Sequence, residues 1–579
     1  MASTRSADRD IVTHSSSAGP SSSSTQPLLH DHYRNNDNHE TEENDSDLET
    51  HSSTNNTDLN DNMAGFFAST TGMTRLGMLR AYWLGFVVCT GGFLFGYDSG
   101  IIGGVLTMPS FEADFNYGAA QKTNVSSLAV SLQQLGAFVA CFAIWPVTHA
   151  FGRKWAIAAC AFIFCLGAAI ETANTHSRPA FYVGRVIAGL GLGGSSVVVP
   201  MFSSEMTPKQ LRGQIGSFYQ LMYTLGIFTS YWIDWGVAKD YAKSDSRMWQ
   251  IPVGLQILWA GLLGIGMLTL AESTRWLTAV GRRDEAWASL KWIRADDGPL
   301  TQAEMEEIRA GVELEAHARE GFRITEMIQG GNLQRTLTAS AVFTAQQATG
   351  ATAFAYYGPQ YFKLLVGNKG NSDLLLTAIF GAIKVAACSL FVLFVADTVG
   401  RRKILTCGAL FMAACQLSTA AVLKTHPAPA DARVTPSGIA TIALIYLFVI
   451  AYNFSWGPLP WPYVSELFPT RIREPGIAVG VASQWLFNFV FSLTTPYMIK
   501  DMGWATFLLW GLFDVCIAGF AWFVLTETQG KSLEEITNVG SSRSGSGKAF
   551  MEDEYEDGHG YGEGHMMRGG GKTPDVEVK

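Results

Sequence analysis

The sequence predicts an all-α membrane protein in which twelve transmembrane helices form two pseudo-symmetric six-helix bundles, joined by a further helical segment. Three observations lead to this fold class. Apolar runs of about 18 residues or more, the length that a helix needs to cross a bilayer, recur through the middle of the chain. A cluster of charged residues at the end of one run recurs half a chain later. Lys and Arg gather in alternate connections between the runs, as expected when segments cross a membrane repeatedly.

The apolar runs divide evenly between the two bundles. The first bundle is expected to cover residues 75–271 and the second to cover residues 336–527. In chain order the runs are centred near Val87, Leu135, Phe162, Leu190, Leu225, Leu262, Ala345, Val385, Leu410, Ile445, Leu486 and Leu512. Because the number of spans is even, both termini are expected on the same side of the membrane.

The repeated charge cluster indicates that the two bundles are copies of one unit. Each of two sets of residues recurs with identical spacing: Phe202, Ser204, Glu205, Pro208 and Arg212 as Tyr463, Ser465, Glu466, Pro469 and Arg473, and Gly152-Arg153-Lys154 as Gly400-Arg401-Arg402. Internal repeats of membrane spans are typical of secondary transporters, whose substrate site lies between the repeats. The duplication therefore favours a transporter over a pair of soluble domains.

The basic residues predict which connections face the cytoplasm. They cluster at Arg75 and Arg80, Arg153 and Lys154, Lys209 and Arg212, Arg401 to Lys403, and Arg471 and Arg473, all on the side of the termini. Short connections rich in Lys and Arg stay in the cytoplasm, so both termini are expected to be cytosolic. The segment 272–335 joins them there, and its Trp and Leu residues recur at helical spacing. We expect it to form an intracellular linker of short amphipathic helices.

The polar ends of the chain are expected to be disordered cytosolic tails. Residues 1–74 and 528–579 contain too few apolar residues to offset the ordering entropy of a fold. The first tail also lacks the apolar core of a signal peptide. The eight cysteines lie in or beside apolar runs without a Cys-x-x-Cys pair, so no disulfide framework and no metal site are expected.

Two ionisable residues inside the first bundle are candidates for proton coupling. Asp98 lies among glycines in the first span, and Arg185 is the only basic residue of the fourth. An ionisable residue at membrane depth is energetically costly and therefore indicates function. If the two side chains meet, Asp98 can be ionised beside Arg185 and take up a proton when a conformational change separates them. The alternative is a static buried ion pair.

Several short motifs together are similar to those of a known family. They are Gly96-Tyr97-Asp98-Ser99-Gly100, Gly184-Arg185, Glu272-Ser273-Thr274-Arg275-Trp276, Gln346-Gln347-Ala348-Thr349-Gly350, Gly457-Pro458-Leu459-Pro460-Trp461 and Glu527-Thr528-Gln529-Gly530. Over about residues 76–535 the chain resembles the sugar porters of the major facilitator superfamily, and specifically the fungal carriers of galacturonate and quinate. The resemblance implies the major facilitator fold, a plasma-membrane location, and proton symport through Asp98 and Arg185, because facilitators of this family have Asn in place of the Asp.

The same resemblance places the substrate site near the membrane midplane, between the bundles. It assigns substrate contacts to Gln220, Gln346, Gln347, Trp461, Trp485 and Asn488. Such amides can bond sugar hydroxyls, and aromatic rings can stack on sugar faces. Gln346 and Gln347 also stand out from the sequence alone, as adjacent amides in an otherwise apolar span.

Two positions depart from the hexose carriers of this family, which have Asn there. This chain has Thr352 at the first position and, near the second, Lys384 inside the eighth span. An intramembrane Lys requires an anionic partner or a water-filled cavity. We therefore expect Lys384 to bind a substrate carboxylate, which predicts an acidic sugar or polyhydroxy acid such as galacturonate or quinate. The alternative is that Lys384 pairs with an acid of the protein or extends its ammonium to the membrane surface.

The repeated charges are candidates for a gate. They are Arg153, Glu205 and Arg212 in the first half, and Asp397, Arg401, Glu466 and Arg473 in the second. Ion pairs at these cytoplasmic helix ends are expected to hold the two bundles together when the substrate site opens outward. The alternative is that these residues only anchor helix ends at the lipid headgroups.

The sequence therefore predicts proton-coupled uptake of a monosaccharide or an acidic sugar, by a protein whose partners are its substrate, protons and the lipid bilayer. Two alternatives stay open, a carrier of neutral hexose or pentose and a transporter-like nutrient sensor that signals through its tails. We find no P-loop or nucleophile elbow, so an enzyme is not expected. Neither a cofactor nor a nucleic acid is expected as a partner, and the chain is expected to work as a monomer.

Overall fold

The structure is a computed structural model that describes residues 74–208, 211–366, 372–394, 400–427 and 435–527. Within these ranges the chain forms helices and no strand. The two predicted tails, apart from Thr74, and the predicted gate residue Asp397 lie outside the described residues.

The helices of the first half are followed directly by those of the linker. They are α2 (Arg75–Val105), α3 (Pro109–Asp114), α4 (Ala119–Phe151), α5 (Arg153–Thr172), α6 (Arg178–Met206), α7 (Arg212–Asp240), α8 (Arg247–Thr269), α9 (Thr274–Ala279), α10 (Arg283–Arg294), α11 (Pro299–Arg319) and the 3₁₀ turn η1 (Ile324–Ile328).

The second half follows the linker. Its elements are α12 (Gly330–Ala348), α13 (Ala351–Val366), α14 (Ser372–Phe394), α15 (Arg401–Thr425), α16 (Pro436–Phe454), α17 (Pro460–Leu467), the 3₁₀ turn η2 (Thr470–Ile472), α18 (Arg473–Met502) and α19 (Ala505–Phe523).

Ten of the described helices are long and apolar enough to cross a membrane. The two remaining predicted spans correspond to α7, which is less apolar, and to α12 with α13, which divide one span between them. The division falls at Gly350, whose φ of 80° is in the left-handed region that favours glycine. Twelve crossing segments result, one of them broken near its middle.

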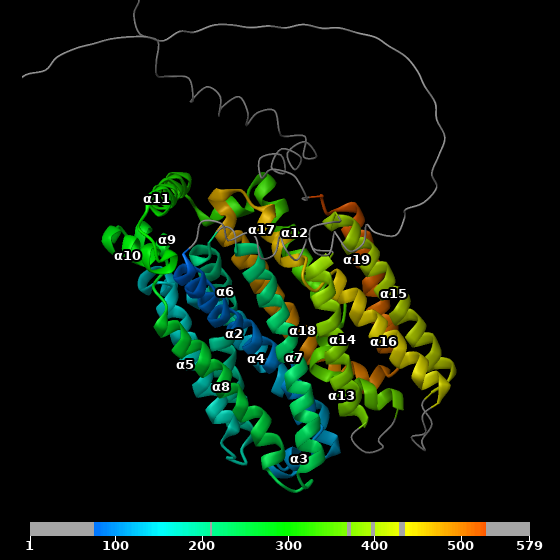
Figure 1. Ribbon diagram of the computed structural model, residues 1–579. Coiled ribbons are helices and arrows are strands. Elements are labelled where there is room, and N and C mark those ends of the chain that lie inside the picture. Colours follow the sequence, from blue (N-terminus) through cyan, green and yellow to red (C-terminus); the bar gives the residue numbers. More distant parts are fainter. Residues whose placement is uncertain (1–73, 209–210, 367–371, 395–399, 428–434, 528–579) are drawn as a thin grey trace, which may run out of the picture. The chain divides into compact units, whose positions relative to one another are not determined.

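Helices pack within each half and also across the chain (Figure 1). In the first half, α2 lies against α7 and α8, α4 against α6, and α5 against α6 and α8. In the second half, α15 lies against α16 and α19, and α12 against α18. The helices α4, α7 and α2 of the first half contact α18, α14 and α13 of the second. The region between the halves is therefore lined by these six helices.

Glycines allow two of these helix pairs to approach closely. A Cβ on Gly189 of α6 would lie 2.1 Å from the carbonyl oxygen of Gln133 on α4. A Cβ on Gly96 of α2 would lie 1.8 Å from the carbonyl oxygen of Tyr223 on α7. Small residues at such contacts let backbones pack directly against one another. These approaches bring polar side chains of α2, α4 and α6 into one buried region.

The linker helices lie at one end of the bundle, here called the linker end, and α3 lies at the other, here called the far end (Figure 1). Helix α10 buries Ala286, Leu290 and Ile293, the apolar face that its spacing predicts. At the far end Ser127 of α4 donates a hydrogen bond to the carbonyl of Leu493 on α18 at 2.5 Å. The two halves therefore touch directly at the far end.

Candidate functional site

A buried ion pair joins the first and fourth membrane spans. Arg185 Nη1 on α6 lies 3.2 Å from Asp98 Oδ1 on α2, and the side chains are 0% and 2% exposed. Gln133 on α4 bridges them, since its Nε2 donates to Asp98 Oδ2 at 2.6 Å and its Oε1 accepts from Arg185 Nη1 at 2.7 Å. The structure thus brings together the two residues that the sequence singles out for proton coupling.

Two neighbours of this pair are missing from the predicted set. One is Gln133, and the other is Glu171 on α5, whose Oε2 lies 3.5 Å from Arg185 Nη1. Either residue could have been singled out from the sequence, because a polar side chain inside an apolar span is energetically costly and therefore indicates a functional role. Glu171 stands near the end of its run and so reads as a residue of the following connection.

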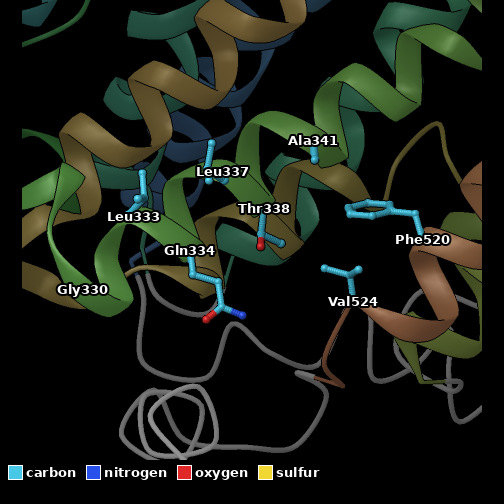
Figure 2. A pocket seen from close by; sticks show the side chains of 8 residues that line it. All are labelled: Gly330, Leu333, Gln334, Leu337, Thr338, Ala341, Phe520 and Val524. Carbon is cyan, nitrogen blue, oxygen red and sulfur yellow. The ribbon is translucent and has the colours of Figure 1, made fainter. Parts of the chain in front are cut away.

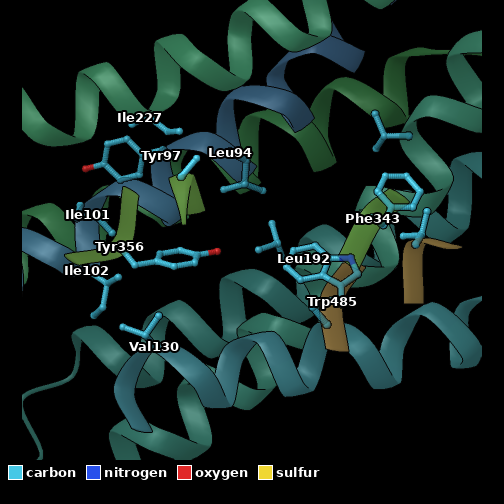
Figure 3. Packing of buried hydrophobic residues seen from close by; sticks show 14 of the residues in the cluster. Leu94, Tyr97, Ile101, Ile102, Val130, Leu192, Ile227, Phe343, Tyr356 and Trp485 are labelled. Carbon is cyan, nitrogen blue, oxygen red and sulfur yellow. The ribbon is translucent and has the colours of Figure 1, made fainter. Parts of the chain in front are cut away.

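Aromatic side chains from both halves, among them Tyr97, Tyr356 and Trp485, lie in one buried cluster (Figure 3). Trp485 of α18 donates from Nε1 to Ser196 Oγ of α6 at 3.3 Å, and its ring lies 5.2 Å from that of Phe95 on α2. Asn488, one turn later, donates to the Tyr356 hydroxyl of α13 at 3.2 Å. The predicted substrate residues Trp485 and Asn488 therefore lie where the halves meet.

The amides of α12 are buried close to the break in this span. Gln346 Nε2 donates to the carbonyl oxygens of Trp456 and Gly457 at 2.9 and 3.1 Å. The Oε1 atoms of Gln346 and Gln347 have no hydrogen-bond partner among the described residues. Unsatisfied buried acceptors are energetically unfavourable, so a hydroxyl or water donor is expected at both.

Three other predicted substrate residues are less buried than Gln346, Gln347, Trp485 and Asn488. Trp461 on α17 is partly buried and packs on Phe343, with ring centroids 5.1 Å apart. Gln220 on α7 and Thr352 on α13 are also partly buried.

Lys384 is buried between the halves, with 4% of its surface exposed. Its Nζ lies 5.3 Å from the ring centroid of Tyr223 on α7 and 6.0 Å from that of Tyr452 on α16. Among the described side chains, no carboxylate is within ion-pair distance of this ammonium. Aromatic faces attract a cation without neutralising it. The site therefore offers an uncompensated positive charge.

The repeated charges form similar networks in the two halves at the linker end. In the first half Arg153 Nε lies 3.2 Å from Glu205 Oε2, and Ser273 donates a hydrogen bond to the same carboxylate. In the second half Arg401 Nη2 lies 2.9 Å from Glu466 Oε1. Each of these pairs joins residues of one half.

Arg473 and Arg212 are the two remaining predicted gate residues. Arg473 donates from Nε to the Ser465 carbonyl at 3.0 Å, which is again a contact within the second half. Helix α7 begins at Arg212, whose side chain lies outside the described part of the structure.

Helix α11 and η1 connect the halves at the linker end. Arg275 of α9 pairs with Glu315 of α11 at 2.5 Å, and Arg319 of α11 pairs with Glu474 of α18 at 2.8 Å. Arg471 of η2 pairs with Glu326 of η1 at 2.8 Å, and this guanidinium lowers the pKa of the Glu326 carboxyl. The connection between the halves at this end thus runs through the linker.

A surface groove of about 390 Å³ lies apart from these residues (Figure 2). It is lined mainly by apolar side chains of α12 and α19, namely Gly330, Leu333, Gln334, Leu337, Thr338, Ala341, Phe520 and Val524. None of the predicted substrate residues lines it, so we do not assign the substrate to this groove.

Known proteins are similar to this chain in sequence and in fold. A family model described as "Sugar (and other) transporter" matches residues 84–539. The quinate permease of Emericella nidulans is 33% identical over 477 residues, which is 79% of this chain and 88% of that protein. A probable quinate permease of Neosartorya fischeri is 34% identical over 484 residues, which is 80% of this chain and 88% of that protein.

Solved structures agree with the sequence comparison. The proton:xylose symporter XylE of the major facilitator superfamily, bound to 6-bromo-6-deoxy-D-glucose, matches with a TM-score of 0.67 and 26% identity, over 80% of this chain and 99% of its own. The inward-open xylose transporter XylE from E. coli matches with a TM-score of 0.66 and 25% identity, over 79% and 99%. The predicted all-helical fold class is confirmed.

Proposed function

We propose, from the premise that this chain belongs to the sugar transporter family of the major facilitator superfamily, that it takes up an acidic sugar or polyhydroxy acid together with protons. Membership makes it a multi-pass membrane transporter and not an enzyme. The single observation that carries the substrate class is the buried ammonium of Lys384, which no described carboxylate neutralises.

Proton coupling is supported by the buried pair of Asp98 and Arg185. Asp98 alternates between an ionised state paired with Arg185 and a protonated state that no longer needs the pair. A solved relative of similar fold is a proton:xylose symporter. One proton and one monocarboxylate together carry no net charge, so the membrane potential does not drive this symport. About two pH units supply about 2.7 kcal/mol, which sustains a substrate gradient on the order of a hundredfold.

An acidic substrate is supported by the polar groups around Lys384. The ammonium attracts a carboxylate, while Gln346, Gln347 and Asn488 offer amides for hydroxyls. Trp485 and Tyr356 supply apolar faces for the ring. Quinate, which is named for the fungal relatives, combines a carboxylate with several hydroxyls.

Alternating access is proposed to move the bundles of residues 75–271 and 336–527 about this central site. The linker of residues 272–335 and the pairs Arg153–Glu205 and Arg401–Glu466 lie at the end that we assign to the cytosol, because that end carries the basic clusters. Both termini then face the cytosol. We further propose that the protein works as a monomer in the plasma membrane.

The test is uptake of labelled quinate, galacturonate and glucose in transporter-deficient yeast, with the external pH recorded. The chain is expected to take up an acidic substrate and to make the medium more alkaline. In Lys384→Met, the KM for the acid is expected to rise at least about tenfold, since a charge-assisted hydrogen bond is lost. Lys384→Arg keeps the charge and is the matched control. Uptake of glucose alone, or unchanged acid uptake by Lys384→Met, would make Lys384 structural and favour a neutral-sugar carrier.

A further inference from the structure

Glu171 is a second carboxylate on the guanidinium that pairs with Asp98. Its side chain is 0% exposed and its Oε2 lies 3.5 Å from Arg185 Nη1. Neither oxygen of Glu171 has a hydrogen-bond partner within the described residues, and the same holds for Nε and Nη2 of Arg185. One buried cation is therefore shared by two buried carboxylates.

The charges of this cluster do not balance without a proton. Asp98, Gln133, Glu171 and Arg185, here called the coupling cluster, carry one positive and two negative charges when fully ionised. A net charge without exposed surface is far more costly than a neutral group. One proton, on either carboxylate, makes the cluster neutral. Two acids that interact so closely titrate as a pair.

We propose that Glu171 is a positioning residue of the proton-coupling site. Glu171 and Asp98 bind the transported proton as a pair, and Glu171 holds Arg185 when Asp98 is protonated. The inference rests on the proposed proton symport. A proton from the medium adds to a carboxylate oxygen of Asp98, which then no longer balances the charge of Arg185. The guanidinium keeps an anionic partner because Glu171 is already beside it.

The backbone of α6 makes room for this second carboxylate. Gly184 directly precedes Arg185, and a Cβ there would lie 2.8 Å from Glu171 Cγ. A larger residue at Gly184 would displace the Glu171 side chain. The same turn of α6 therefore carries the cation and admits the acid that shares it.

Other charged groups on the surrounding elements have partners of their own or lie toward the far end. Asp114 on α3 accepts from Trp249 Nε1 at 2.7 Å and from Asn174 at 3.2 Å, and Arg178 donates to Gln121 at 2.9 Å. Two titratable groups of α13 in the second half interact with the cluster, Tyr356 with Asp98 and Arg185, and Tyr357 with Arg185. Only Arg185 forms an ion pair with Glu171 among the described side chains.

The experiment compares proton-driven uptake by the full chain in proteoliposomes at a series of external pH values. Glu171→Gln removes one negative charge, so the cluster is neutral without a proton. Its proton affinity is expected to fall at least about tenfold, which moves the pH of half-maximal uptake about one unit lower. Exchange of labelled for unlabelled substrate, which needs no net proton movement, is expected to continue.

Two further variants separate this role from a structural one. Asp514→Asn removes another buried carboxylate, on α19 of the second half, and is expected to leave the pH profile unchanged. Glu171→Asp keeps the negative charge, but the shorter side chain places it farther from Arg185. Its pH of half-maximal uptake is expected to move in the same direction as in Glu171→Gln, by a smaller amount. A Glu171→Gln profile that superimposes on the wild-type profile, with exchange intact, overturns the proposal. If Glu171→Gln does not fold, an unshifted Glu171→Asp profile overturns it.

Failure of the proposed symport gives a different result. In that case the wild-type chain shows no proton entry with substrate, and Asp98→Asn transports as well as the wild type. Failure of the Glu171 proposal alone leaves wild-type coupling and its dependence on Asp98 in place.

Discussion

Glu272 and Glu527 occupy corresponding positions in the two halves of the chain. Glu272 Oε1 accepts hydrogen bonds from the backbone N–H groups of Arg153 and Lys154 at 2.9 and 3.0 Å, at the start of α5. Glu527 accepts from the N–H groups of Arg401 and Arg402 at 2.8 and 3.2 Å, at the start of α15. A carboxylate at a helix N-terminus satisfies free N–H groups and complements the helix dipole. The two halves thus share a capping contact besides their charge pairs.

Loss of either cap is expected to destabilise its half to a similar extent. Glu272→Gln and Glu527→Gln should each lower the free energy of unfolding by about 0.3–1 kcal/mol, because Gln still accepts hydrogen bonds but loses the negative charge that complements the helix dipole. Thermal unfolding in detergent measures the change. Glu285→Gln, which breaks an exposed pair with Arg282, serves as the control and should have little effect. A cap variant as stable as this control would contradict the expectation.

Asp98→Asn is expected to uncouple transport from the proton gradient. Asn keeps the shape but cannot bind a proton at physiological pH, so with a pH gradient and no membrane potential the ratio of internal to external substrate should fall to about one. Exchange across the membrane should continue. Accumulation and exchange in the same proteoliposomes give both readings. Accumulation that survives the substitution would place the coupling proton elsewhere.

Trp485→Ala is expected to weaken substrate binding more than it weakens the fold. Loss of a central aromatic face should raise the KM up to about tenfold, since such contacts contribute about 0.5–1.5 kcal/mol beyond the area that they bury. Initial uptake rates over a range of substrate concentrations test this. Phe162→Ala removes an aromatic ring that is 71% exposed on α5 and is the matched control. Equal KM values for the two variants would remove Trp485 from the site.

The pair of Glu326 and Arg471 gives the linker a predictable pH dependence. Arg471 lowers the pKa of Glu326 from its ordinary value of 4.5, so the pair stabilises the folded linker above that pH and is lost as the pH falls through the lower, folded value. Hydrogen exchange of η1, corrected for intrinsic rates, should therefore be constant from neutral pH down to about pH 5 and increase below it.

Arg471→Gln provides the comparison for this prediction. Without the guanidinium, the Glu326 pKa returns toward its ordinary value, and η1 should exchange faster even at neutral pH. Arg282→Gln, at the residue before α10, breaks an exposed pair elsewhere in the linker and should leave η1 unchanged. Protection of η1 that is insensitive to Arg471→Gln would show that backbone contacts alone hold this segment.

Functional residues are easiest to predict from the sequence where a side chain is energetically costly to place in a membrane. Asp98, Arg185 and Lys384 stand out because each introduces an ionisable group into an apolar span. The structure buries all three, and it pairs the first two. The all-helical class follows from the length of the apolar runs, although α7 is too polar to qualify by composition.

Tyrosines around the site could not be predicted in this way. Tyr223, Tyr356 and Tyr452 meet Lys384 or Asn488, but an aromatic residue in an apolar span is ordinary and carries no signal of its own. Which helices face one another also depends on packing between segments far apart in the chain, such as α4 with α18. Periodicity within one helix does not contain this information.

The break at Gly350 allows α13 to tilt relative to α12. A Cβ at this residue would lie 2.8 Å from the Trp510 ring, and its φ of 80° already favours glycine, so no other residue fits there without strain. Helix α13 is not one straight rod, because Tyr357 has a non-helical backbone (φ −120°, ψ 20°) that kinks it. Tyr357 follows Gly350 by seven residues, a rise of about 10 Å, so a tilt of about 10° at the break moves it by about 2 Å. A displacement of about 2 Å is enough to lengthen the hydrogen bond of 2.7 Å between the Tyr357 hydroxyl and the Ser492 carbonyl beyond hydrogen-bonding distance. A tilt of α13 alone can thus break this contact between α13 and α18 at the far end, without any movement of α12.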